Sequence, residues 1–380
     1  MKVAVVISNP NLYGGVNKFT SDLINIFKSH NFKVAVCSWF KPINGKCYDG
    51  FTNIDKVFLA SWFSKKIKGK LWKILFASCS AVKRCIKKFK PDVIINANVE
   101  PAIFRVVSDN IIKVQYCHFP TELKVYKHDL IRLIYRIPYW YYHYKELTRL
   151  NAVVCNSNYT FEIARAIWGN YISKKKFHVI YPMVDLTRFK RELLRENKIC
   201  YVGRIDIKKG INHVIKAYLQ IYNKFKPKLI IAGGVSEKNI SYYRYLKKKI
   251  EKLQMKNYPI ELKANVPYKE ITEILLTSKI MASYNEGEHF GIVPVESQAA
   301  GCVPIVADSG GQKETVLHFE TGFRAKSPKE IKKYMEYLLS STDVWAAMSR
   351  KAKQWAEEFS TKKIGEKWIR LIENLTISKD

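Results

Sequence analysis

The sequence predicts an α/β protein with two parallel-sheet domains, on the evidence of its length, its segment pattern and its composition. The chain has 380 residues, which is more than one hydrophobic core usually serves. Short β-branched segments alternate with longer segments of helical periodicity, an order typical of a parallel sheet covered by helices on both faces. Hydrophobic residues make up 47 % of the chain, which favours folded cores over disorder.

The predicted strands form two series on either side of a hinge at Tyr181–Arg188. The first series is Val3–Ile7, Lys33–Ser38, Ile54–Phe58, Asp92–Asn96, Ile112–Tyr116, Ala152–Asn156 and His178–Tyr181. The second is Ile199–Val202, Leu229–Ala232, Ile260–Lys263, Ile280–Ser283 and Val303–Ala307, followed by helices at Lys329–Leu339, Val344–Phe359 and Lys363–Leu375. We therefore predict one domain over residues 1–182, a second over 183–358, and a C-terminal helix within 359–380 that packs back on the first domain.

One stretch late in the sequence, Asn285–Gly301, carries two carboxylates at a promising place. Glu288 lies in the loop after a predicted strand, and Glu296 lies inside the predicted helix Val293–Ala300, which Gly301 suits as a left-handed terminating residue. Ligands of open α/β sheets bind at the carboxyl ends of the strands, and a helix N-terminus attracts anions. The pair would suit a ligand that has both hydroxyls and phosphates, although such residues are more often solvated or capping.

Three further turns after predicted strands hold candidate binding residues. The pair Gly14-Gly15 lets backbone approach a ligand closely, although most such pairs are only turns. His118 follows a strand directly, where ligands bind, although a lone His is more often structural. Arg204 and Lys209 lie at the first strand-to-helix turn of the second domain. The planar guanidinium of Arg204 and the point charge of the Lys209 ammonium suit a pyrophosphate.

The charge of the chain predicts an anionic partner. The net charge of +32 would attract nucleic acid, a phosphorylated substrate or an anionic membrane. The stretch Trp62–Lys90 holds ten Lys and Arg residues, no acid, and interleaved aromatic and aliphatic residues, a composition typical of a helix on an anionic membrane surface. A solvated helix packed on the sheet and a nucleic-acid groove are the alternatives. A second aromatic and basic stretch, Leu123–Leu150, indicates another membrane-facing or acceptor-facing surface, or core.

Cysteine usage and hydropathy predict a cytoplasmic protein. The eight cysteines show no metal-ligand spacing, which fits free thiols in a reducing compartment. The apolar N-terminal run is too short for a signal peptide, and no apolar stretch reaches the ~18 residues of a spanning helix. Any membrane attachment is therefore expected to be peripheral, on the cytoplasmic face.

The order of these motifs resembles the retaining glycosyltransferases of family 4, which have the GT-B fold. The resemblance is carried by Gly14-Gly15, His118, Gly203-Arg204 with Lys209-Gly210, Glu288-x7-Glu296, and Gly310-Gly311 with Glu314. Within the family, three segments are similar to the dolichol-pathway α-1,2-mannosyltransferases of lipid-linked oligosaccharide assembly: His118-Phe-Pro-Thr121, Cys155-Asn-Ser157 and Glu288-His-Phe-Gly-Ile292.

The resemblance implies two Rossmann-like domains facing a cleft, the first binding the acceptor and the second the nucleotide sugar. Arg204 and Lys209 would neutralise the diphosphate as the glycosidic bond breaks, which is electrostatic stabilisation of developing charge. Glu288 would accept hydrogen bonds from sugar hydroxyls, and Glu296 would hold the ribose hydroxyls.

The resemblance also assigns the remaining site residues. The N–H groups around Phe290, Gly291 and Ile292 would complete the donor pocket. Gly15 would let backbone approach the phosphate or acceptor, and His118 would contact the transferred sugar near the reacting centre. Retention in the family is attributed to front-face attack, so no protein nucleophile is assigned.

The expected reaction is transfer of a hexose, best matched by mannose from GDP-mannose, to a polyprenyl- or dolichyl-linked glycan. The alternatives are a UDP-sugar-dependent glycosyltransferase of cell-surface polysaccharide synthesis, a nucleotide-sugar 2-epimerase, and a basic nucleic-acid-binding protein. No nucleic-acid recognition motif occurs, so no such partner is expected. The chain has no Asp-x-Asp motif, so we expect no metal requirement and no cofactor.

Overall fold

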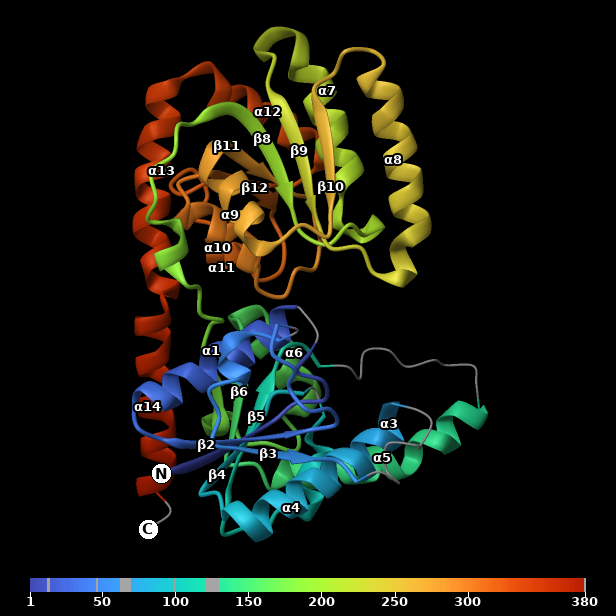
Figure 1. Cartoon of the computed structure of the whole chain (residues 1–380), viewed down its shortest axis with the longest axis vertical. Coiled ribbons are helices and arrows are strands. Elements are labelled where there is room, and N and C mark those ends of the chain that lie inside the picture. Colours follow the sequence, from blue (N-terminus) through green and yellow to red (C-terminus); the bar gives the residue numbers. More distant parts are fainter. Residues whose placement is uncertain (12–13, 46, 62–69, 99, 121–129, 379–380) are drawn as a thin grey trace. The chain divides into compact units, whose positions relative to one another are not determined.

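The computed structural model describes residues 1–11, 14–45, 47–61, 70–98, 100–120 and 130–378. These residues form two compact units (Figure 1). Unit 1 is Met1–Met183 with Ile364–Asp380, and unit 2 is Val184–Lys363. The division after Met183 lies inside the hinge segment predicted from the sequence.

Unit 1 is built on a seven-stranded parallel sheet in the order β3-β2-β1-β4-β5-β6-β7. Its strands are β1 (Lys2–Val6), β2 (Lys33–Ser38), β3 (Lys56–Leu59), β4 (Val93–Asn96), β5 (Ile112–Cys117), β6 (Ala152–Cys155) and β7 (Phe177–Val179). Its helices are α1 (Gly15–Ser29), α3 (Lys70–Lys73), α4 (Cys79–Phe89), α5 (Leu130–Thr148), α6 (Asn158–Trp168) and, for the most part, α14 (Thr361–Ile377). Short helical turns are η1 (Asp49–Phe51), η2 (Ile74–Ser78), η3 (Pro101–Val106) and η4 (Lys174–Lys176).

Both faces of this sheet are buried, because successive strand residues point to opposite sides. Val3 and Val5 belong to one core, which includes residues of α1 and α14. Ala4 and Val6 belong to the other, which includes residues of α4 and α6. Strands that are apolar on both faces are the expected result for a parallel sheet with helices on each side.

Trp368 is the largest of the side chains through which helix α14 packs on unit 1. Trp368 is fully buried, and its ring lies 5.9 Å from the ring of Phe19 and 5.8 Å from that of Tyr116. Phe19 and Tyr116 stack on each other at 3.8 Å between centroids. The C-terminal segment therefore contributes to the core of the first unit, although unit 2 precedes it in the chain.

Unit 2 is built on a six-stranded parallel sheet in the order β10-β9-β8-β11-β12-β13. Its strands are β8 (Glu196–Val202), β9 (Lys228–Gly233), β10 (Ile260–Ala264), β11 (Ser278–Ala282), β12 (Val303–Ala307) and β13 (Phe323–Ala325). Its helices are α7 (Ile211–Phe225), α8 (Ile240–Gln254), α9 (Tyr268–Thr277), α10 (Ile292–Ala299), α11 (Gln312–Thr315), α12 (Pro328–Ser340) and α13 (Thr342–Ala356). Short turns are η5 (Leu186–Phe189), η6 (Ile207–Lys209), η7 (Glu237–Asn239) and η8 (Glu357–Phe359).

The predicted α/β class and the predicted strands are confirmed, with end positions that differ by at most three residues. Strand β13 was missed because it is three residues long and pairs only with β12 at the edge of the sheet. Helix α10 is confirmed, and Gly301 beyond it has a left-handed φ of 73°, as its position predicted. Local capping signals act elsewhere too, since Ser157 accepts a 3.0 Å hydrogen bond from the Thr160 N–H at the start of α6.

The basic stretch Trp62–Lys90 is described only in part. Residues 62–69 lie outside the described residues, as do the side chains of the next two. In the remainder, the apolar Ile74, Leu75 and Val82 are buried, whereas basic residues such as Lys87 are exposed. The described part of the stretch thus packs on unit 1 through apolar residues and exposes its basic ones, as both the membrane-facing and the solvated interpretation require. Among the described residues, no helix has the length and apolarity needed to cross a bilayer.

We predict that Trp368→Ala lowers the free energy of unfolding by about 3–5 kcal/mol, the usual cost of removing a buried aromatic side chain. Urea unfolding followed by circular dichroism measures the change. Lys367→Ala is the matched control, because Lys367 is the exposed preceding residue of α14 and should change stability by less than about 0.5 kcal/mol. Equal stability of the two variants would show that α14 does not depend on this contact.

Candidate functional site

The candidate site lies where the strand order of unit 2 reverses. From β8 the sheet extends through β9 and β10 on one side and through β11, β12 and β13 on the other. In open α/β sheets, ligands bind at such a reversal of strand order, outside the carboxyl ends of the strands. Lys209 lies in the loop after β8, and Glu288 lies in the loop after β11.

The two loops meet through a pair of charges. Lys209 Nζ lies 2.6 Å from Glu288 Oε2, and Asn285 Nδ2 donates to the same oxygen at 2.6 Å. Burial raises the pKa of Glu288, but the charge of Lys209 and the hydrogen bonds from Lys209 and Asn285 outweigh it and hold that pKa below its usual value. Glu288 is therefore a carboxylate at neutral pH, able to accept hydrogen bonds from hydroxyls.

A glycine in a left-handed conformation brings these loops together. Gly210 has a φ of 68°, and a Cβ there would overlap with the carbonyl oxygen of Tyr284, just after β11. Only glycine combines this conformation with so close a backbone approach. The approach places the preceding residue, Lys209, within reach of Glu288.

A second glycine turn supports the backbone of Glu288 from the other side. The Gly311 N–H donates to the Glu288 carbonyl at 2.8 Å. A Cβ at Gly310 would overlap with that same carbonyl group, and one at Gly311 would overlap with the carbonyl of His289. The pair Gly310-Gly311 therefore has a packing role: it presses the loop after β12 against the carboxylate-bearing loop.

Arg204 lies on the same loop as Lys209 but is exposed. Its carbonyl oxygen accepts a 2.8 Å hydrogen bond from the Tyr201 hydroxyl. The hydrogen bond from the Lys208 N–H, together with the charges of Arg204 and Lys209, holds the pKa of Asp206 below its usual value. The structure thus joins Lys209 to Glu288 directly and places the Arg204 charge on the neighbouring part of the loop.

Glu296 belongs to a separate cluster on α10. It is 7 % exposed and accepts a hydrogen bond from the Tyr268 hydroxyl at the start of α9. Burial and the adjacent Glu296 charge raise the pKa of Tyr268, so the hydroxyl stays protonated and can donate this hydrogen bond. The Arg188 guanidinium lies 4.7 Å from the Tyr268 ring centroid, and Arg188 Nε is 2.8 Å from Asp185 Oδ2.

Sequence reasoning missed Tyr268 and Arg188. Tyr268 precedes Glu296 by 28 positions and lies on another helix, and Arg188 was noted only as part of the hinge. No motif spacing links these residues. They become neighbours because α9 and α10 pack side by side on one face of the sheet, as seen in Figure 1.

The segment between the two carboxylates has mixed roles. Phe290 is 3 % exposed and its ring lies 5.7 Å from that of Phe359, so this side chain is core. Gly291 has a φ of 95° at the N-cap, and Ile292 is the first residue of α10. What this segment can offer a ligand is the positive N-terminal end of a helix, not the Phe290 ring.

His118 and Gly15 belong to unit 1. His118 follows β5, with Nε2 3.2 Å from the Ala97 carbonyl oxygen, and its ring packs edge-on against Tyr116 at 4.7 Å. Gly15 is exposed and opens α1 after β1. Because β1, β4 and β5 are neighbours in the sheet, both residues lie at its carboxyl edge.

Two further observations concern metals and thiols. Within the described ranges, no three side chains among His, Cys, Asp and Glu are grouped so that they could hold a metal ion. All eight cysteines are buried free thiols.

Two family models match consecutive parts of the chain. The model described as Glycosyltransferase Family 4 matches residues 13–188, and the model described as Glycosyl transferases group 1 matches residues 184–355. The first match covers most of unit 1, and the second covers most of unit 2, including Lys209, Glu288 and Glu296.

Several curated relatives are mannosyltransferases. Human α-1,3/1,6-mannosyltransferase ALG2 is 25 % identical over 284 residues, covering 69 % of this chain and 68 % of the relative. The enzyme of the same name from Saccharomyces cerevisiae is 27 % identical over 244 residues, covering 54 % and 48 %. A GDP-Man:Man(3)GlcNAc(2)-PP-Dol α-1,2-mannosyltransferase of Dictyostelium discoideum is 24 % identical over 242 residues, covering 59 % and 47 %. The chain thus spans between about half and two thirds of the length of these relatives.

Solved structures agree with the fold over nearly the whole chain. Sucrose-phosphate synthase from Thermosynechococcus elongatus superposes with a TM-score of 0.78 at 16 % identity, covering 99 % of both chains. Anabaena Alr3699/HepE in complex with UDP superposes with a TM-score of 0.76 at 16 % identity, covering 98 % of this chain and 100 % of that one. With its two parallel-sheet units, its strand-end motifs and the two consecutive family matches, this chain belongs to the family 4 glycosyltransferases of the GT-B fold.

Proposed function

We propose that this glycosyltransferase moves mannose from GDP-mannose to a polyprenyl- or dolichyl-linked glycan, working peripherally at the cytoplasmic face of a membrane. The observation that carries the proposal is the contact of Lys209 and Asn285 with Glu288 at the switch point of unit 2. It combines a hydroxyl-binding carboxylate with a phosphate-binding cation. The names of the mannosyltransferase relatives support the choice of sugar and acceptor.

The chemistry of the donor site follows from these groups. The bond between the anomeric carbon and the diphosphate breaks, and its electron pair stays on the diphosphate. The oxygen of the acceptor hydroxyl forms the new bond on the same face of the sugar, and its proton passes to the departing diphosphate oxygen. Lys209 has three N–H donors, so it can contact Glu288 and still donate to the diphosphate. Arg204 adds a second cation, and the two stabilise the charge that develops in the transition state.

The second carboxylate suits the nucleoside. Glu296 would accept hydrogen bonds from the ribose hydroxyls, with its other oxygen held by the hydroxyl of Tyr268. The N–H groups of Phe290, Gly291 and Ile292 at the start of α10 would face the anionic part of the donor. From unit 1, Gly15 would let backbone approach the phosphate or acceptor.

A panel of nucleotide sugars tests the proposal. The purified chain is offered GDP-mannose, UDP-glucose and UDP-N-acetylglucosamine, each with a polyprenyl-diphosphate-linked glycan. Nucleotide release and the mass shift of the acceptor are both measured. GDP release with a gain of one hexose on the acceptor is expected. Transfer from a UDP-sugar alone would overturn the assignment of GDP-mannose, and donor conversion without any acceptor would indicate an epimerase.

We predict that Glu288→Gln, which keeps the size of the side chain and removes its charge, lowers the rate of transfer by at least ~10²-fold. Melting followed by circular dichroism should change little, because the side chain is not part of the core. Glu286→Gln is the matched control, since Glu286 lies in the same loop, is exposed, and accepts a 2.9 Å hydrogen bond from the Tyr284 hydroxyl. Near-normal transfer by folded Glu288→Gln would contradict the donor-site assignment.

We also predict that transfer is independent of divalent metal. The reason is that the chain lacks an Asp-x-Asp motif and provides Arg204 and Lys209 for the leaving diphosphate. The initial rate is measured in excess EDTA, beside a metal-dependent glycosyltransferase as a positive control for chelation. A loss of activity that Mg²⁺ or Mn²⁺ restores would show that the two cations do not suffice.

His118 is proposed to contact the transferred sugar from the acceptor domain. We expect His118→Ala to lower turnover by at least ~10-fold, in the range of a lost catalytic contact, while the dissociation constant for GDP stays unchanged. His30→Ala is the control, because His30 is an exposed histidine at the end of α1 in the same unit. Equal losses of GDP affinity and turnover, or a fall in melting temperature alone, would instead favour a structural role.

A further inference from the structure

Helix α5 has two apolar faces, and one of them is its contact with the core of unit 1. Tyr139, His143, Leu147 and Leu150 recur at helical spacing and at its end, and each is at most 5 % exposed. This face packs against η3 and, in the case of Leu147 and Leu150, joins the core beneath the sheet. This buried face agrees with one of the interpretations of the stretch Leu123–Leu150, namely that it is core.

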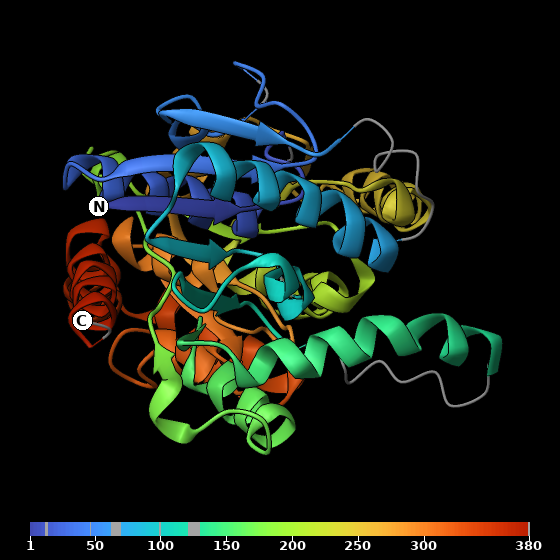
Figure 2. The same cartoon turned by 90° about the horizontal axis from the view of Figure 1, so that it is seen from below.

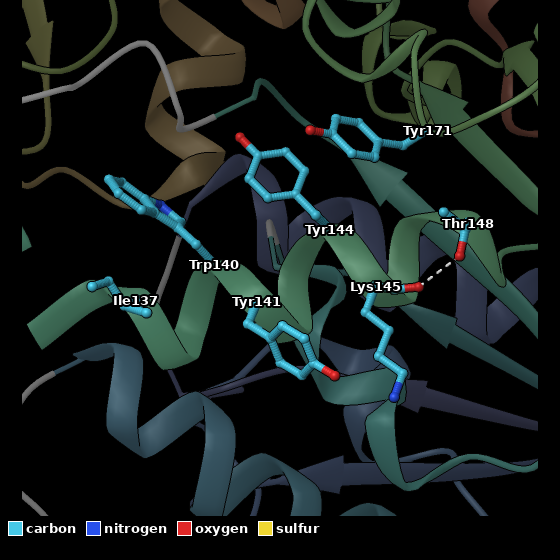
Figure 3. A pocket seen from close by; sticks show the side chains of 7 residues that line it. All are labelled: Ile137, Trp140, Tyr141, Tyr144, Lys145, Thr148 and Tyr171. Carbon is cyan, nitrogen blue, oxygen red and sulfur yellow. Dashed lines mark hydrogen bonds between the residues drawn. The ribbon is translucent and has the colours of Figure 1, made fainter. Parts of the chain in front are cut away.

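The opposite face of α5 is also apolar, but it is exposed. Ile137 is 54 % exposed and Tyr141 is 60 % exposed, although they are one helical turn apart on a folded helix. Trp140, Tyr144 and, from the loop after α6, Tyr171 extend this face. Together with Lys145 and Thr148, these side chains line a cavity of about 520 Å³. Figure 3 shows all of the lining side chains.

Such a face needs an explanation, because the outer side of a helix in a water-soluble protein is usually polar. Exposed contiguous apolar surface typically marks a site for a protein partner, a ligand or a membrane. The rings of Tyr144 and Tyr171 contact each other in a tilted arrangement, at 4.6 Å between centroids, so the aromatic groups of this face are contiguous. Apart from Tyr171, the face lies on α5, which Figure 1 and Figure 2 both show extending beyond the edge of the seven-stranded sheet.

The charges around this face indicate what binds there. Lys145 lies 5.6 Å from the Tyr141 ring centroid, and the exposed Lys174 and Lys175 follow shortly after Tyr171 in the chain. Between residues 130 and 176 the acids are Glu146 and Glu162. Glu146 is buried and paired with Arg149, so it does not offset the charge of the lysines named above.

We infer that this outer face of α5, with Tyr171, docks on the interfacial layer of an anionic bilayer. Tyr and Trp favour the membrane–water interface, where the ring lies among the acyl chains and the polar tip stays hydrated. Lysine stems can lie along apolar surface while their ammonium groups reach anionic head groups. The inference rests on the proposed function in one respect: a lipid-linked acceptor presents its glycan at such an interface. It adds α5 to the stretch Trp62–Lys90, for which the sequence predicts a membrane contact.

The test is flotation of the full chain with vesicles. The probes are vesicles of phosphatidylcholine and of phosphatidylcholine mixed with phosphatidylglycerol. We expect wild type to float with the anionic vesicles, and Ile137→Ser/Tyr141→Ser to lose at least ~10-fold in partition coefficient, because each lost side chain removes buried apolar area. The matched control is Ile240→Ser/Tyr245→Ser on α8, whose residues are 41 % and 53 % exposed, and which should bind as wild type does.

The outcomes separate this inference from the donor-site proposal. Both double variants replace exposed residues, so both should fold, and both should keep normal transfer to a short water-soluble acceptor. Slowed transfer to a vesicle-embedded acceptor by the α5 variant alone supports the inference. Unchanged flotation of that variant overturns it. The inference is also overturned if wild type does not bind vesicles and the α5 variant has a lower molecular mass than wild type by light scattering. The face would then join two copies of the chain. Glu288→Gln is expected to lose transfer and to float as wild type does. The donor-site proposal and the membrane-docking inference can therefore fail separately.

Discussion

Close packing of backbone against backbone at glycines determines where the functional groups of unit 2 lie. Gly210 abuts the carbonyl of Tyr284, and Gly310 abuts that of Glu288. Any side chain at these positions would force the loops after β8, β11 and β12 apart. The 2.6 Å contact between Lys209 and Glu288 depends on that packing, because the two residues are 79 positions apart and share no element.

The same packing prepares the site electrostatically. Glu288 is desolvated when the protein folds, and Lys209 and Asn285 hold it ionised. Its carboxylate is therefore an oriented hydrogen-bond acceptor before any hydroxyl-rich ligand binds. Fixed charges stabilise a developing charge better than solvent does, because they need not reorganise when it appears. The Tyr268 hydroxyl does for Glu296 what Asn285 does for Glu288: it donates a hydrogen bond that fixes one carboxylate oxygen.

Most apolar residues of the helices in both units lie in a core. In unit 2 this is the case for α7 and α12. In unit 1, α5 buries one apolar face and exposes another, and Lys145 lies beside Tyr141 on the exposed one. The large positive net charge of the chain thus has a local counterpart beside an aromatic surface, a combination that suits an anionic interface better than a free anion in solution.

The sequence by itself determined the parts of this protein that depend on neighbouring residues. Alternating burial along β1 and a left-handed Gly301 after α10 follow from local periodicity and backbone preference, so both could be predicted. Glu288 and Lys209 could also be singled out, because each follows a strand. Only the tertiary structure decided that Lys209 touches Glu288, that Tyr268 holds Glu296, and that Phe290 is core. The physical reason is that sheet order makes distant strand ends neighbours, and a hydrogen bond depends on that proximity and not on separation along the chain.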